Sequence, residues 1–455
     1  MGTDRKRNAV NTTATSDTVK HLLAEWIRAY HRRRRPVEVS FRRAVHLPHY
    51  PDRATHLLHP YPAKLLAHIP YIFSRADVLG RPATSVLDPF SGSGTVLLEG
   101  ALAGVRVSGA DPNPLSRLVT KVKLTPLPAD VILDALSSVS RSARAYRFGD
   151  VPNADIIDYW YGAKACRGLA RLRRAIMERE ADDVRDALLV SFAVCARRLS
   201  RADPRLSVPV RVRYAKYPKG HPVRLQLFRH QRRVASADPI DTYTEITRLM
   251  ARRIGALSDL GVKPRSLMHM STDARDLATK YQHDLVITSP PYAGAQKYVR
   301  ALSLGLAWLG WGGREELRVL QRATIGRDQY TKEEYLAIPE TTVASANRLL
   351  EQVAKINPLR AHIAARYLVE MDQALMEVSK ATSADAALVL VAGKNTVVGR
   401  PFNTPAYLRT IAETYGWELN LELVDRILGR ALLTRRNGGA SAIAEERVML
   451  FRKVS

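Results

Sequence analysis

The chain has 455 residues, of which 46% are hydrophobic, enough to bury the cores of two or three domains. Its 70 lysines and arginines against 44 acidic residues give a net charge of +26, which suits a polyanionic partner such as nucleic acid. An arginine-rich proteome would produce the same excess without a nucleic-acid role. No apolar run is long enough to span a membrane, and residues 1–17 lack the hydrophobic region of a signal peptide, so the sequence predicts a soluble, cytoplasmic protein without membrane association.

Residues 1–16 are polar and threonine-rich, which predicts a disordered tail. The next segment, 17–58, is predicted to be helical and basic, with apolar residues at helical spacing over 17–35. Four arginines, Arg32–Arg35, end this helix. Either favourable interaction with the helix dipole or contact with phosphate would explain them.

Short apolar runs then alternate with helical patterns. Residues 85–88 and 105–110 are predicted strands, and helices are predicted to begin after them at Thr95 and Pro114. This βαβ pattern indicates a parallel sheet. The pattern resumes later with predicted strands at 285–288, 387–392, 418–424 and 447–452, and with helices near 365–380 and from Thr404.

Residues 125–260 separate the two halves of the predicted sheet and form an insertion. Helical patterns near 156–179 and 181–199 precede a basic segment with several prolines, predicted to be extended. From Ala196 to Arg233, 12 of 38 residues are lysine or arginine and only Asp203 is acidic, so this stretch is a candidate polyanion surface. Its predicted DNA-binding residues are Arg211, Arg213, Lys216, Lys219, Arg224, Arg229, Arg232 and Arg233. Tyr214, Tyr217 and Phe228 lie between these cations and either pack a small subdomain, which we favour, or stack on bases.

The segment VLDPFSGSGT, residues 86–95, is a strand that runs into a loop of small residues and then a helix. Gly92 and Gly94 let backbone NH groups approach a ligand, at the kind of strand end where open α/β sheets bind nucleotides. Leu97 replaces the third glycine of the dinucleotide motif, and no GKS or GKT follows, so NAD and ATP fit poorly. Asp111 ends the next strand 17 residues after Gly94, where a carboxylate can accept both hydroxyls of a ribose. Together these residues indicate an adenosine-containing ligand.

A second strand, 284–288, leads directly into Ser289, Pro290, Pro291 and Tyr292. Prolines fix φ and remove NH donors, so this loop is stiff and presents carbonyl acceptors. The Ser289 hydroxyl and the Pro290 carbonyl can hold the two hydrogens of an amino group during methyl transfer, while Tyr292 stacks on a base swung out of a duplex. Taken alone, the tetrapeptide would also fit an ordinary proline-rich turn.

The segments LDPFSGSGTVLLEG, GADPNPLSRLV and TSPPY, in this order, resemble motifs of the amino-group DNA methyltransferases. The resemblance implies an α/β fold of the Rossmann-like methyltransferase type, with a mainly parallel sheet flanked by helices and a largely helical, basic insertion. Residues 59–124 and 261–455 would form the catalytic domain, and 125–260 the target-recognition region. In this family the recognition region lies between the two motifs, but here the insertion precedes Asp273 instead of following it.

The resemblance also implies S-adenosylmethionine as cofactor. Its pocket would include Asp88, Phe90, Gly92, Gly94 and Thr95 in the loop, Asp111 at the ribose, His59 and Tyr61 at the methionine end, and Asp273 at the adenine. A proline-restrained turn is the alternative for the segment that holds His59 and Tyr61, and helix capping is the alternative for Asp273.

A leading serine in the tetrapeptide is typical of the family's cytosine-N4 enzymes, and aspartate or asparagine of its adenine-N6 enzymes. Ser289 therefore favours cytosine N4 in double-stranded DNA, with adenine N6 as the alternative. An RNA amino-methyltransferase and a catalytically silent nucleic-acid binder remain further alternatives. Cytosine-C5 methylation is disfavoured because it needs a cysteine nucleophile, usually after a proline, and neither Cys166 nor Cys195 has that context. We expect these two cysteines to form no disulfide and no metal site, and a restriction or phage-defence system is a possible partner.

Overall fold

The structure is a computed structural model that describes residues 16–47, 52–62, 64–263, 266–294, 298–426 and 445–454. Residues 1–15 of the predicted disordered tail lie outside the described residues, and Ser16 is the first residue of helix α1. None of the helices within these ranges is long and apolar enough to cross a membrane.

The centre of the molecule is a mainly parallel sheet, which has eight strands among the described residues, in the order β1-β9-β10-β6-β5-β2-β3-β4. The strands are β1 (Val37–Val39), β2 (Ser85–Asp88), β3 (Arg106–Ala110), β4 (Leu267–Ser271), β5 (His283–Thr288), β6 (Thr382–Gly393), β9 (Trp417–Arg426) and β10 (Glu445–Lys453). Only β10 runs antiparallel to its neighbours, β6 and β9. A separate hairpin pairs β7 (Asn395–Val397) with β8 (Arg400–Phe402). The sheet is the predicted Rossmann-like α/β arrangement.

Helices cover both faces of this sheet, because successive strand residues point to opposite sides. Val86 packs in one hydrophobic cluster with α3 (His68–Arg75) and α4 (Thr95–Leu102). Its neighbour Leu87 packs in a second cluster with α16 (Pro358–Lys380) and α17 (Thr404–Thr414). The remaining helices outside the insertion are α1 (Ser16–Arg33), α2 (Phe41–Ala44), α5 (Pro114–Leu124), α12 (Tyr298–Leu309), α13 (Arg314–Ala323), α14 (Lys332–Leu336) and α15 (Ala344–Ala354).

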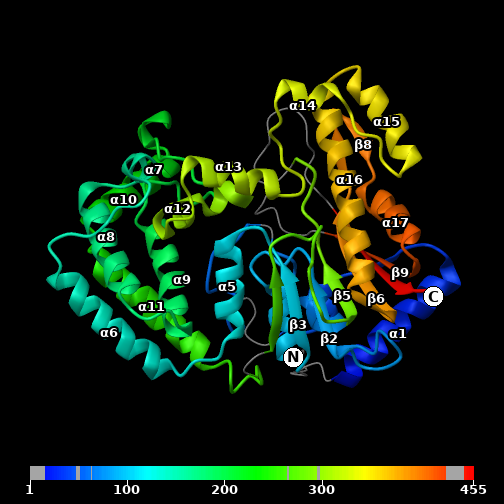
Figure 1. Cartoon of the computed structure of the whole chain (residues 1–455), viewed down its shortest axis with the longest axis horizontal. Helices are drawn as coiled ribbons and strands as arrows, with labels where there is room; N and C mark the ends of the chain where they lie inside the picture. Colours follow the sequence, from blue (N-terminus) through cyan, green and yellow to red (C-terminus); the bar gives the residue numbers. More distant parts are fainter. Residues whose placement is uncertain are drawn as a thin grey trace, which may run out of the picture.

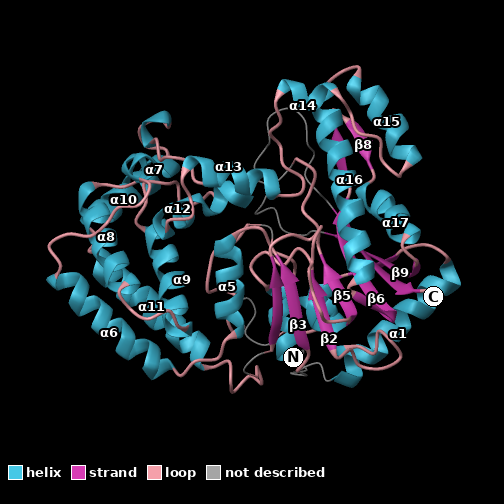
Figure 2. Ribbon diagram, in the orientation of Figure 1, coloured by secondary structure: helices cyan, strands magenta, loops and turns pink. Residues whose placement is uncertain are grey.

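The insertion is a helical unit beside the sheet, drawn at the left of Figures 1 and 2. It contains α6 (Ala129–Ala145), α7 (Ala154–Trp160), α8 (Ala163–Met177), α9 (Asp183–Arg198), a short 3-10 turn η1 (Tyr214–Lys216), α10 (Pro222–Ser236) and α11 (Pro239–Gly255). Helix α12 is packed into this unit, since the Trp308 ring lies edge-on against Tyr161 at 5.5 Å and Phe192 at 6.0 Å.

The prediction of an extended basic segment is wrong for its second half, which forms α10. Pro222 occupies the first helical turn, where a missing NH costs nothing, and the His221 ring accepts a hydrogen bond from the Val223 NH at 3.1 Å. Leu227 and His230, about one turn apart, are the buried residues of this helix. Strands β1 and β4 were not predicted; they lie at the two edges of the sheet and lack a strong alternation of buried residues.

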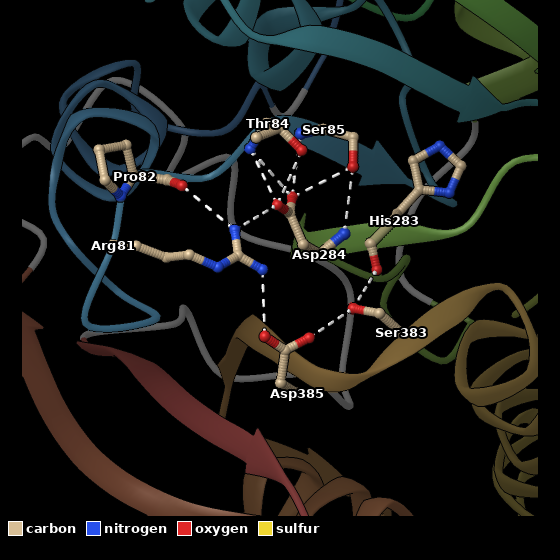
Figure 3. A network of polar contacts seen from close by, with 8 residues as sticks. All are labelled: Arg81, Pro82, Thr84, Ser85, His283, Asp284, Ser383 and Asp385. Atoms are coloured by element: carbon tan, nitrogen blue, oxygen red, sulfur yellow. Dashed lines mark hydrogen bonds and ion pairs between the residues drawn. The ribbon is translucent and has the colours of Figure 1, made fainter.

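The amino-terminal ends of β2, β5 and β6 are held together by Asp284, which Figure 3 shows at the centre of a polar network. Its carboxylate accepts hydrogen bonds from the backbone NH groups of Thr84 and Ser85, at 2.9 Å each, and from Arg81 Nη1 at 3.0 Å. Arg81 also reaches Asp385 of β6 at 3.1 Å. Burial would raise the pKa of Asp284, but these hydrogen bonds outweigh it and lower the pKa. The charged form therefore stabilises the fold.

We predict that Asp284→Asn lowers the free energy of unfolding at pH 7 by about 2–4 kcal/mol, because buried donors lose an ionised acceptor. A carboxyl group with a lowered folded-state pKa stabilises the protein above its unfolded pKa of about 3.9, and this contribution is lost as the pH falls through the folded pKa. Urea unfolding at several pH values should therefore show the difference between wild type and variant shrinking in acid. A constant difference down to the acid limit would contradict this role.

Candidate active site

The loop after β2 is shaped by two glycines and two neighbouring side chains. Gly92 and Gly94 have φ values of +50° and +74°, a region that favours glycine. A Cβ at Gly94 would lie 2.8 Å from Thr120 Oγ1, and one at Gly92 would lie 3.1 Å from the Tyr61 ring. The loop is therefore pressed between α5 and Tyr61, and only glycine allows this close approach.

Asp88, the last residue of β2, joins this loop to the end of β5. Its Oδ1 accepts hydrogen bonds from the Phe90 NH at 3.1 Å and from the Thr288 hydroxyl at 2.7 Å. Burial raises the pKa of Asp88 to about 7. Because Thr288 directly precedes Ser289, this hydrogen bond positions the tetrapeptide relative to the glycine loop.

Asp111 follows β3 at the adjacent strand end. Its side chain accepts the Asn113 NH at 2.8 Å, while Arg117 binds the backbone oxygens of Asp111 and Pro112 at 2.7 and 2.9 Å. Burial raises the pKa of Asp111 to about 7. The carboxylate is thus fixed in place and has acceptor capacity left for a ligand that donates hydroxyl groups.

One cavity connects these groups, enclosing about 910 Å³ including its opening to solvent. The predicted site residues that line it are Tyr61, Asp88, Phe90, Gly92, Thr95, Asp111, Asp273, Ser289 and Pro291. Gly94, Pro290 and Tyr292 lie in the same loops but are not among its lining residues. Further lining residues that were not predicted include Lys64, Tyr298 and the segment 323–325.

His59 was predicted at the methionine end of the pocket and is not among the residues that line the cavity. Its side chain is buried, and burial lowers its pKa to about 3, so the ring is neutral. Lys64 lines the cavity in its place, with Nζ donating to the backbone oxygens of His56 and His59 at 2.9 Å each. Lys123 Nζ, fully buried beside the loop, donates to the Ser93 backbone oxygen at 2.7 Å.

The two lysines have no carboxylate partner within ion-pair distance among the residues that the structure describes. Burial lowers the pKa of Lys64 to about 8 and that of Lys123 well below its ordinary value. Of the two, Lys64 lines the cavity, and because buried cations are normally paired, its end of the cavity favours a ligand with a negative group.

Asp273 lines the cavity and is held in place by linked ion pairs. Arg275 Nη2 contacts its carboxylate at 2.7 Å, and Arg275 Nη1 lies 3.3 Å from the buried Glu370 of α16. Arg275 also donates to the Ala323 backbone oxygen at 2.9 Å. No helix begins in the segment after Asp273, 274–294, so helix capping is not the role of this residue.

The tetrapeptide loop contributes Ser289 and Pro291 to the cavity wall, and contacts of Tyr292 hold it in place. The Ser289 hydroxyl has no hydrogen-bond partner among the described residues and remains available to a ligand. Tyr292, in contrast, donates its hydroxyl hydrogen to Glu446 of β10 at 3.2 Å. Gly326 lies so close that a Cβ there would be 3.0 Å from the Tyr292 backbone oxygen.

Tyr298, the first residue of α12, packs over Tyr61 with ring centroids 6.5 Å apart. The two rings come from segments more than 200 residues apart in the sequence, so no local pattern could pair them. Lys64 follows His59 and Tyr61 within the same short segment, from which only those two residues were predicted.

The predicted DNA-binding residues lie in the insertion, outside the cavity. Six of them are exposed: Arg213, Lys216, Lys219, Arg229, Arg232 and Arg233. Arg211 and Arg224 are half-buried; the Arg211 guanidinium lies over the Tyr159 ring at 4.6 Å, and Arg224 donates to the Tyr217 backbone oxygen at 2.8 Å. Among the described residues, no acidic side chain forms an ion pair with any of the eight.

Within the same ranges, no group of three or more histidine, cysteine, aspartate or glutamate side chains is arranged to hold a metal ion. Cys166 and Cys195 are free thiols, the first half-buried and the second buried.

No known protein-family profile matches the chain. It is 23% identical over 374 residues to the type II methyltransferase M.MvaI of Kocuria varians, covering 75% of this chain and 77% of that protein. Two structures of the rRNA methyltransferase aviRa from Streptomyces viridochromogenes also match; each covers 91% of this chain and 96% of that one, at 12 and 13% identity, with a TM-score of 0.30. The similarity to M.MvaI supports a methyltransferase.

The glycine loop can be tested with a matched pair of variants. Gly94 and Gly104 both have positive φ, but only Gly94 would bring a new Cβ into contact, with Thr120. Gly94→Ala should therefore lower the free energy of unfolding by about 1–3 kcal/mol more than Gly104→Ala, since it adds overpacking to the shared backbone strain. Urea unfolding of both variants measures the difference. Equal losses would show that the loop can move away from Thr120.

Proposed function

We propose that this protein transfers a methyl group from S-adenosylmethionine to an exocyclic amino group of a DNA base, with cytosine N4 as the target and adenine N6 as the alternative. The observation that carries the proposal is the single cavity lined by the glycine loop, Asp111 and Ser289. A donor and an acceptor of a methyl group would meet there without crossing bulk water. The similarity to a type II methyltransferase supports the same reaction class.

The residues of the cavity fit this cofactor. Gly92 and Gly94 let the loop pack closely against Tyr61 and Thr120, and Gly92 lines the cavity, where its backbone can approach a ligand. Asp111 would accept the ribose hydroxyls, and Asp273 the adenine amino group. Lys64, which lines the cavity and has no carboxylate partner among the described residues, would favour the carboxylate of the methionine end. When bound, the cofactor supplies an electrophilic methyl group on a positively charged sulfur.

The protein's own contribution is positioning and electrostatics. The Ser289 hydroxyl and the Pro290 carbonyl would accept hydrogen bonds from the two amino hydrogens of the target base, which leaves the nitrogen lone pair free to attack. As the nitrogen–methyl bond forms, the sulfur–methyl bond would break and release S-adenosylhomocysteine, and the surplus amino proton would pass to solvent. Thr288 keeps Ser289 in place through its hydrogen bond to Asp88. Tyr292 would stack on the base after it leaves the duplex, with its ring anchored through Glu446. The serine at the first position supports cytosine over adenine by resemblance to the family.

We propose DNA as the substrate because the insertion is basic and because the motifs resemble those of the DNA methyltransferase family. RNA carries the same phosphates, so charge alone does not separate the two. A role in restriction-modification, phage defence or epigenetic marking would follow from a DNA substrate, with a restriction enzyme or defence system as a possible partner.

Cofactor binding should depend on the ionisation of Asp111. Ribose hydroxyls donate to the ionised carboxylate, and the pKa of this group is raised to about 7, so binding favours the deprotonated form. The affinity for S-adenosylhomocysteine should therefore rise between pH 6 and pH 8 by up to about tenfold. Asp111→Asn should bind more weakly and lose most of this dependence, measured by calorimetry. An unchanged pH dependence in the variant would assign the titration to Asp88 instead.

The reaction itself is tested by methyl transfer from labelled S-adenosylmethionine to unmethylated genomic DNA, followed by nucleoside mass spectrometry. N4-methylcytosine is the expected product; N6-methyladenine would correct the base, and label in RNA alone would replace the substrate. Tyr292→Ala should lower turnover about tenfold, the loss expected for one stacked base, and leave cofactor affinity nearly unchanged. Unchanged turnover would remove the stacking role of Tyr292.

A further inference from the structure

Helix α10 has an outer face built of cations and neutral side chains. Its sequence, PVRLQLFRHQRRVAS, contains four arginines and no acidic residue. Leu225, Gln226, Arg229, Arg232 and Arg233 are all exposed, and their spacing of one, three, three and one residues places them on one side of the helix. The helix is 15 residues long, and this face carries no charge that would repel a polyanion.

The inner face of α10 fixes the helix without using these outer cations in ion pairs. Leu227 and His230 are buried against the rest of the insertion. Gln231 donates to the Val212 backbone oxygen at 3.4 Å, and Lys164 of α8 donates to the Ser236 backbone oxygen at 2.7 Å. The arginines of other helices in this protein do pair with acids: Arg366 with Glu370, and Arg198 with Glu245. The outer arginines of α10 have no acidic partner among the described residues and remain available to an anion from outside the chain; Arg233 Nη2 also lies 3.3 Å from His230 Nδ1.

The side chains on this face can do more than bind phosphate. Arginine can form two hydrogen bonds to guanine, and glutamine two to adenine, in the major groove of DNA. A helix with its side chains is about 10–12 Å wide, and that groove is about 12 Å wide. Gln226 lies one turn before Arg229, and Arg229 one turn before Arg233, so the three would follow one another along the groove. Arg213, Lys216 and Lys219, exposed in the preceding segment, would lie toward the backbone phosphates.

The insertion connects this face rigidly to the cavity. Helix α12 begins at Tyr298 in the cavity wall and ends in the insertion, a length of about 18 Å for its 12 residues. At its far end the backbone oxygens of Ala307 and Trp308 accept hydrogen bonds from Asn153 at 3.1 Å and Arg173 at 2.9 Å. Figure 1 shows α12 beside α7, and α10 above α8, in the same helical unit. One turn of DNA is about 34 Å long, so a duplex with a base in the cavity can extend along this unit.

We propose that α10 is the sequence-reading helix of this protein and lies in the major groove of double-stranded DNA with Gln226, Arg229 and Arg233 toward the base edges. The proposal rests on the proposed DNA methylation, but it concerns how the site is chosen and not the chemical step.

The test compares two double variants with the same change in charge. Arg229→Gln/Arg233→Gln alters the outer face of α10, and Arg248→Gln/Arg252→Gln alters exposed arginines of α11 in the same insertion, which line a shallow groove away from the cavity. Methylated positions in genomic DNA are mapped by sequencing for each variant and for the wild type, and S-adenosylhomocysteine affinity is measured as a check on the cavity. Gln226→Ala, a neutral change on an exposed surface, gives a second variant whose folding is not at risk.

The α10 double variant should methylate the wild-type sites at least about tenfold less efficiently, equivalent to one lost base contact, with cofactor affinity unchanged. Gln226→Ala should relax the sequence preference at a single position. The α11 variant should keep the wild-type sites and rate. If the α10 variants methylate the same sites as efficiently as the wild type, α10 is not the reading helix, although the enzyme is still a methyltransferase.

Salt-dependent binding to a short duplex distinguishes failure of the two proposals. If the wild type transfers no methyl group to DNA but binds the duplex, and the α10 double variant binds it at least about tenfold more weakly while the α11 variant does not, the proposed chemistry fails and α10 remains the DNA contact. If all three proteins bind with the same affinity at each salt concentration, the α10 proposal fails.

Discussion

The hydrogen bond from Thr288 to Asp88, at 2.7 Å, joins the two halves of the candidate active site. β2 and β5 are neighbours in the sheet although almost 200 residues separate them in sequence, so the glycine loop and the tetrapeptide emerge side by side. At the opposite ends of the same strands, Asp284 binds the backbone of Thr84 and Ser85. Polar contacts at both ends thus hold this strand pair in one register, and every distance across the cavity depends on that register.

The pKa values of buried carboxyl groups are shifted in opposite directions at the two ends of these strands. Asp284 is supplied with backbone donors and an arginine, which lower its pKa and make its charge a source of stability. Asp88 and Asp111, in the cavity, have fewer donors, and burial raises their pKa to about 7. Buried carboxyl groups with raised pKa values are often found at sites where a ligand completes their interactions. This contrast supports a binding role for the cavity end of the sheet.

The insertion and the sheet that carries the cavity are packed together. Trp308 packs between Tyr161 and Phe192, so the helix that starts at the cavity wall ends in the core of the insertion. Lys121 of α5 adds ion pairs to Asp183 and Asp186 of α9, at 2.8 and 2.6 Å. A DNA surface carried by this unit would hold a fixed position relative to the cavity, which is what a site-specific transfer requires.

The sequence alone was enough to predict the parallel sheet, because buried strands such as 285–288 and the helix starts at Thr95 and Pro114 are local patterns. It also determined the glycine loop, Asp111 and Ser289 as candidate site residues, since each directly follows a strand. Only the tertiary structure decided that Lys64 and not His59 faces the cavity, that Tyr298 packs over Tyr61, and that half of the basic segment is a helix with an exposed arginine face. Those features depend on contacts between distant segments and on which side of an element is buried. A single sequence does not directly indicate which distant segments touch or which side of an element is buried.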